Sequence, residues 1–81
     1  MFYYVYVLIS KKDGSTYVGY TNNINRRIKE HNNGFVPSTK NKKPFELIYF
    51  EGHKNNKMAL NREMYLKTGW GRNYIKKIIN R

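Results

Sequence analysis

Two short aromatic segments separated by a turn constrain the fold of this chain more than any other feature. β-Branched and aromatic residues fill both Tyr4-Val5-Tyr6 and Tyr17-Val18-Gly19, and such residues favour β-strands. Asp13-Gly14 lies between them, and this dipeptide is a strong signal for a hairpin turn. We therefore expect an antiparallel hairpin that brings Tyr6 and Tyr17 onto neighbouring strands.

The remaining sequence predicts one more strand and two to three helices. The expected elements are strands over residues 2–10, 15–21 and 45–51 and helices over residues 24–33, 56–68 and 71–81. Gly34, Gly52 and Gly69 are expected to end elements. A basic segment without periodicity, residues 34–44, predicts a mobile loop. The order ββαβα(α) predicts an α/β or α+β fold, in which helices flank a small, mostly antiparallel sheet of three strands.

Two positions in the hairpin carry more specific expectations. The first strand is apolar at most positions, so we expect it to lie in the centre of the sheet, with both faces covered. Gly19 interrupts the second strand. A glycine inside a strand marks either a bulge or a place where a ligand or another backbone comes close, and the sequence leaves both open.

Length and charge restrict the function. At 81 residues the chain can form one small core, so we expect a single domain over residues 1–81. Without cysteine, neither disulfides nor a zinc ribbon can supplement that core. Sixteen Lys and Arg against five Asp and Glu give a net charge of +11, which favours nucleic acid as partner. The apolar run over residues 2–9 is far shorter than the roughly 20 residues of a membrane span, so we expect a cytoplasmic protein without a membrane partner.

Four side chains of the hairpin and the first predicted helix are candidates for a site. Tyr6 and Tyr17 face a helix on which Arg27 and His31 flank an apolar stripe. An arginine can bind two phosphate oxygens at once, and a histidine titrates near neutral pH. The residues alone leave open that the tyrosines are core, that Arg27 is a solvated charge and that His31 is structural.

Glu63 is the candidate metal ligand among the five acidic residues. It lies in the middle of the second predicted helix, on the face of Ala59 and Leu66. Phosphodiester hydrolysis needs an activated water and stabilised phosphoryl oxygens, and one Mg²⁺ held by one or two carboxylates supplies part of both. The residues alone leave open that Glu63 is an exposed glutamate paired with Lys67, four residues further on.

This ordered set of residues resembles the GIY-YIG nuclease superfamily, and within it the small single-domain proteins of the UPF0213 group. Tyr4-Val5-Tyr6 and Tyr17-Val18-Gly19 are similar to the segments that name the superfamily. Residues 25–32 are similar to its helix with an arginine and a histidine, and residues 59–67 to the Ala-x-x-x-Glu-x-x-x-Lys helix of the small group. The chain departs from the pattern at Tyr4, where the family has glycine, and at Tyr20, where some excision-repair relatives have lysine.

The resemblance implies a role for each candidate. Tyr17 would be the general base that orients and deprotonates the attacking water, with Tyr6 hydrogen-bonded nearby. Arg27 would bind the scissile phosphate, and His31 would relay a proton or bind phosphate. Glu63 would hold Mg²⁺ or Mn²⁺.

The basic residues outside this set are expected to hold the substrate backbone by phosphate contacts, which position without reading sequence. Trp70 either stacks on a base or forms a hydrophobic cap between the last two helices, and His53 is expected in a surface loop. The expected nucleic-acid contacts are Lys40, Lys42, Lys43, Lys67, Arg72, Lys76 and Lys77.

The leading hypothesis is a Mg²⁺-dependent endonuclease that hydrolyses phosphodiester bonds in DNA, directed by substrate structure and with little sequence preference. We expect little preference because nothing in the chain resembles a sequence-reading module. The alternatives are a non-catalytic basic module that binds DNA or RNA, and an accessory subunit of a DNA-processing complex whose protein partner supplies targeting.

Overall fold

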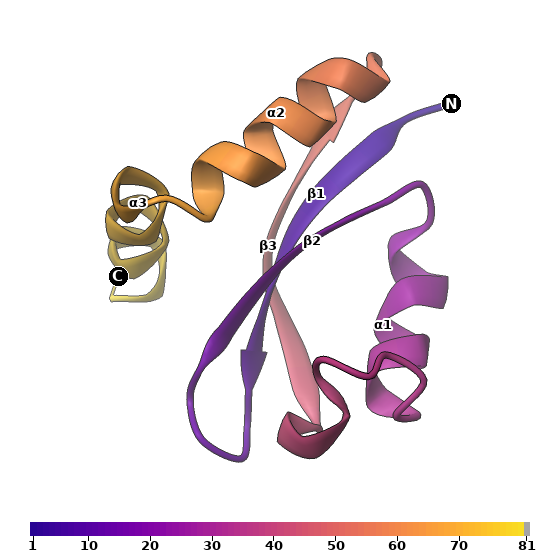
Figure 1. Ribbon diagram of the computed structural model, residues 1–81, viewed down its shortest axis with the longest axis vertical. Coiled ribbons are helices and arrows are strands. Elements are labelled where there is room, and N and C mark those ends of the chain that lie inside the picture. The colour runs from indigo at the N-terminus through magenta and orange to yellow at the C-terminus, as the bar shows by residue number, and fades with distance from the viewer. Residues whose placement is uncertain (81) are drawn as a thin grey trace.

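The computed structural model describes residues 1–80 and contains one antiparallel sheet of three strands with helices on both faces (Figure 1). The elements are β1 (Tyr3–Ser10), β2 (Thr16–Thr21), α1 (Ile24–Asn32), the short 3-10 helix η1 (Lys40–Lys42), β3 (Phe45–His53), α2 (Asn56–Leu66) and α3 (Gly69–Ile79). The strand order is β2-β1-β3, and β1 pairs antiparallel with both neighbours. The predicted α+β class and order of elements are therefore confirmed.

The central strand β1 separates two hydrophobic clusters, because successive side chains of a strand point to opposite faces. Val5 and Val7 face α2 and α3, where they pack with Val18, Ala59, Leu66 and Ile75. Tyr6 and Leu8 face α1, where they pack with Phe45. Figure 1 shows α1 on one side of the sheet and α2 and α3 on the other. Both faces of β1 are covered, as its continuous apolar character predicted.

The boundary between the last two helices differs from the prediction. α2 ends at Leu66, and α3 already begins at Gly69, the residue that the sequence predicts as the end of α2. Thr68 is the N-cap of α3, and its hydroxyl accepts a hydrogen bond from the Gly71 amide. A Cβ at Gly71 would lie 2.3 Å from the Leu66 Cα, so glycine allows the two helices to meet this closely.

Two other segments also differ from the prediction. β3 continues through Gly52, the expected end, to His53, which lies opposite Tyr3 in the sheet rather than in a loop. The segment over residues 34–44 contains η1 and buries Val36 and Thr39. None of the helices within residues 1–80 has the length and apolar character that a membrane-spanning segment requires.

Candidate active site

The hairpin brings Tyr6 and Tyr17 together on the α1 face of the sheet. Tyr6 lies opposite Gly19 and Tyr17 opposite Leu8, so the two tyrosines are diagonal neighbours with ring centroids 6.4 Å apart. A Cβ at Gly19 would lie 2.3 Å from both Cζ and Oη of Tyr6. The absence of a side chain at Gly19 thus lets the Tyr6 ring reach across β2. The group that comes close to Gly19 is a side chain of the protein itself, whereas the sequence suggested a bulge, a ligand or another backbone.

His31 holds the Tyr6 hydroxyl from the interior. Its ring is fully buried, with Nε2 2.9 Å from Tyr6 Oη and Nδ1 2.8 Å from Thr39 Oγ1. Thr39 also donates to the Val36 carbonyl, which leaves its oxygen to accept from Nδ1–H. The remaining nitrogen, Nε2, then accepts from the Tyr6 hydroxyl. Burial lowers the pKa of His31, and the nearby Arg27 lowers it further, so the imidazole is neutral at pH 7.

The Tyr6 hydroxyl is the point at which the other candidates converge. Burial raises the pKa of Tyr6 to about 12, against the lowering effect of the adjacent Arg27 guanidinium. Tyr17 and Glu63 also lie close enough to raise this pKa by their charges. Tyr6 is therefore protonated at neutral pH, and among the two tyrosines it is unsuited to act as the base.

Arg27 lies on α1 at the edge of β2, with its side chain about one third exposed. One guanidinium nitrogen donates to Glu30 Oε1 at 2.8 Å, and this carboxylate raises the pKa of Arg27. Arg26 is more exposed and reaches Asn22 Oδ1 at 3.2 Å and Glu30 at 3.6 Å. Both arginines line a hollow of about 270 Å³ beside Tyr20. The pairing of Arg27 with Glu30 was not anticipated from the sequence.

Glu63 lies on α2, on the other side of the sheet, close enough to Tyr6 for its charge to raise the pKa of that hydroxyl. Its carboxylate lies 3.5 Å from Lys67 Nζ, so the pairing that the helical spacing allowed is present. The described part of the chain contains no cluster of three His, Cys, Asp or Glu residues that could hold a metal ion by themselves. The single carboxylate of Glu63 is a donor of the kind that Mg²⁺ takes, because this ion binds one or two carboxylates and completes its shell with water and phosphate oxygens.

Residues 2–76 match the family model of the GIY-YIG catalytic domain. The chain belongs to the GIY-YIG family. A UPF0213 protein of Clostridium perfringens is 48% identical over 65 residues, which cover 79% of this chain and 69% of that protein. A UPF0213 protein of Staphylococcus saprophyticus is 42% identical over 67 residues, covering 82% and 80%.

A solved structure gives the same result for the fold of this GIY-YIG domain. The solution NMR structure of a UPF0213 protein from Bacillus halodurans superposes with a TM-score of 0.59 at 32% identity, covering 96% of this chain and 85% of that one. The resemblance to the small UPF0213 group is thus confirmed. Membership implies nuclease-type activity, and the names of these relatives state no substrate, metal or mechanism.

The basic residues predicted to bind nucleic acid fall into two groups in this GIY-YIG domain. Lys40, Lys42 and Lys43 lie in and after η1, where Lys42 Nζ is 3.7 Å from the Asp13 carboxylate of the hairpin turn. The second group lies at the end of α2 and in α3, on the face of the sheet opposite α1. It consists of Lys67, Arg72, Lys76 and Lys77. Lys67 and Arg72 line a hollow of about 150 Å³ together with Tyr17, so this second group borders the candidate site.

A polar network far from these residues was missed by the sequence analysis. Glu51 on β3 accepts hydrogen bonds from Tyr49 Oη at 2.6 Å, Arg62 Nε at 2.8 Å and His53 Nε2 at 2.9 Å. Burial raises the pKa of Glu51, and these three donors outweigh burial and lower it. The network joins α2 to the edge strand β3, and it places His53 in a half-buried hydrogen bond with Glu51 instead of a surface loop.

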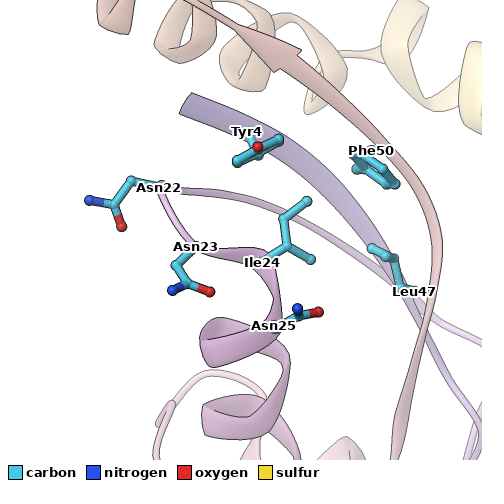
Figure 2. A pocket seen from close by; sticks show the side chains of 7 residues that line it. All are labelled: Tyr4, Asn22, Asn23, Ile24, Asn25, Leu47 and Phe50. Carbon is cyan, nitrogen blue, oxygen red and sulfur yellow. The ribbon is translucent and has the colours of Figure 1, made fainter. Parts of the chain in front are cut away.

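A cavity of about 390 Å³ between the start of α1 and the sheet contains none of the predicted catalytic residues (Figure 2). Figure 2 shows Tyr4 and Phe50 on one side and three asparagines on the other. No charged side chain lines it. The lining residues are Tyr4, Asn22, Asn23, Ile24, Asn25, Leu47 and Phe50.

Proposed function

We propose that this domain, over residues 1–81, is an endonuclease that hydrolyses phosphodiester bonds in DNA with the help of Mg²⁺ or Mn²⁺. The observation that supports the proposal is that Tyr6 packs against Tyr17, with ring centroids 6.4 Å apart, while Arg27 and Glu63 lie close enough to influence the pKa of the Tyr6 hydroxyl. These four residues come from four elements, β1, β2, α1 and α2. A strongly basic surface with a net charge of +11 would draw the polyanionic substrate to these residues.

The metal would be held by Glu63, whose only ion-pair partner within residues 1–80 is the half-exposed Lys67. When bound, a divalent cation neutralises charge on the phosphoryl oxygens and makes a coordinated water more acidic. Arg27 would bind the scissile phosphate bidentately, exchanging its contact with the Glu30 carboxylate for phosphate oxygens.

The two tyrosines take different parts in this proposal. Tyr17 is partly exposed at the β2 edge, so its hydroxyl can orient the attacking water. As the general base it would act in its phenolate form, which takes one proton from that water and becomes the neutral phenol. Tyr6 is 1% exposed and protonated, and its oxygen is free to accept a hydrogen bond from water or Arg27 while its proton is held by His31. His31 lies behind Tyr6 and does not reach the surface, so we assign it as a positioning residue.

We further propose that substrate structure, or a protein partner, determines where the enzyme acts. The groups described above contact phosphate and water, and such contacts carry no sequence information. A partner that supplies targeting would leave the chemistry of the β2 edge unchanged.

The test is nicking of supercoiled plasmid and of branched DNA with Mg²⁺ or Mn²⁺ by wild type and by Glu63→Gln, with DNA binding measured in parallel. Glu46→Gln is the matched control, because Glu46 is an exposed glutamate on β3. We expect metal-dependent cleavage that is lost in Glu63→Gln and kept in Glu46→Gln, with binding intact in both. Salt-sensitive binding by all three proteins without cleavage would refute the enzyme and favour the non-catalytic module or the accessory subunit.

A further inference from the structure

Trp70, the only tryptophan of the chain, lies exposed at the start of α3. Its side chain is 77% accessible to solvent, more than that of any other aromatic residue among residues 1–80. It therefore does not form the hydrophobic cap between α2 and α3 that the sequence allowed. The indole is therefore available for a contact outside the folded chain.

The surroundings of Trp70 are basic. Trp70 lines a hollow of about 450 Å³ together with Gly69, Arg72, Asn73 and Lys76, and no acidic side chain lines it. A protein partner with an apolar surface would have to bury these charges at a large cost. A polyanion with planar apolar groups, which is what a nucleic acid strand is, complements both the charges and the indole.

This basic hollow borders the candidate active site through one shared residue. Arg72 also lines the small hollow that contains Tyr17 and Lys67, along the outer edge of β2. A strand whose phosphate lies near Tyr17 can therefore pass Arg72 and bring a neighbouring base to Trp70.

We propose that Trp70 stacks on an unpaired base of a single-stranded segment, whose phosphates are held by Arg72 and Lys76. The bases of a duplex are already stacked on each other, so only an unpaired or displaced base offers a free face to the indole. The inference rests on the proposed function for the substrate class it names: DNA with a single-stranded segment next to the cleaved bond.

Binding without metal tests this inference separately from catalysis. The intrinsic fluorescence of Trp70 is titrated in EDTA with a single-stranded oligothymidylate and with a duplex of the same length. We expect quenching by the single strand and little change with the duplex. Affinities of Trp70→Leu and Trp70→Phe for a fluorescein-labelled single strand are then measured by anisotropy, with circular dichroism to establish folding.

Trp70→Leu should bind the single strand about tenfold more weakly, in line with base–aromatic stacking, while Trp70→Phe keeps most of the affinity. Phe50→Leu is the matched control, because Phe50 is also an exposed aromatic residue but borders the uncharged cavity of Figure 2. We expect wild-type affinity and quenching for it.

Equal affinity of wild type and Trp70→Leu, or absence of quenching, would overturn the inference. So would a larger loss in Phe50→Leu than in Trp70→Leu, which would place the base in the other cavity. Quenching by a single strand in a protein that cleaves no DNA would support the Trp70 site and refute the nuclease. Cleavage without quenching would support the nuclease and overturn the Trp70 site.

Discussion

Substitution of Gly19 by alanine tests the geometry of the site most sharply, because one methyl group is added where the Tyr6 ring lies. The new Cβ would be 2.3 Å from Tyr6 Cζ and Oη, whereas ordinary contacts begin at 3.4 Å. The phenol must therefore move by about 1 Å. Tyr6 is 1% exposed, and its hydroxyl is bonded to the fully buried His31, so there is no free space into which it can move.

The cost follows from two separate effects. Overpacking of a buried ring costs about 1–3 kcal/mol. Loss of the bond between Tyr6 and His31 leaves a buried nitrogen without a partner, which costs about 1–3 kcal/mol more. We expect the free energy of unfolding of Gly19→Ala to fall by about 2–6 kcal/mol. Cleavage should fall at least about a hundredfold at temperatures where the variant is folded, because Tyr6 is displaced from the site.

Urea unfolding followed by circular dichroism measures the first quantity, and plasmid nicking measures the second. Gly52→Ala is the control, because Gly52 lies on the opposite edge strand, β3, and its added Cβ would be 3.3 Å from the nearest atom of the Tyr4 ring. It should lose less than about 1 kcal/mol and keep its activity. Unchanged stability and full cleavage in Gly19→Ala would refute the placement of Tyr6 across β2.

Three further predictions concern the side chains around Tyr6. Because the pKa of His31 is lower in the folded than in the unfolded protein, the free energy of unfolding should be complete above the unfolded pKa of about 6.5 and fall as the pH drops below it. Urea unfolding at pH 7.5 and at pH 5.5 should show a smaller loss of stability in His31→Gln than in wild type, and equal losses would contradict this prediction. Thr39→Val removes the partner of His31 Nδ1 and should cost about 1–3 kcal/mol in urea unfolding, with Thr39→Ser near wild type; equal stability of the two variants would contradict the bond. Arg27→Lys loses the bidentate geometry of the guanidinium and should slow plasmid nicking about tenfold or more. The control Arg26→Lys should change the rate less than about twofold, and equal effects of the two variants would argue against a special role for Arg27.

The order of elements could be predicted from the sequence because it depends on local patterns. A continuous apolar strand indicated a covered central position, and Asp13-Gly14 indicated the hairpin. Helix ends were less predictable, since glycine is the residue type that most often follows the end of a helix, and Gly69 was therefore expected to end α2. Its actual place, the first residue of α3, depends on the cap by Thr68 and on the tight approach that Gly71 allows.

The contacts of the candidate site could be predicted only in part. Helical spacing placed Arg27 and His31 on one side of α1, and the resemblance to the family singled out Glu63. The bond between His31 and Thr39 depends on the path of a loop with no periodic signal. The same holds for Glu51 and Arg62, which lie on different elements and meet only because α2 packs on β3.

In the proposed function, side chains from different elements act together as one hydrolytic site. Its most direct test is a double-mutant cycle in single-turnover cleavage with Mg²⁺, using Tyr17→Phe, Glu63→Gln and the double variant. Residues that act as a unit show strongly non-additive effects. We predict that the double variant is scarcely slower than the slower single variant. Losses that multiply in the double variant, or a wild type that does not cleave, would contradict this proposal.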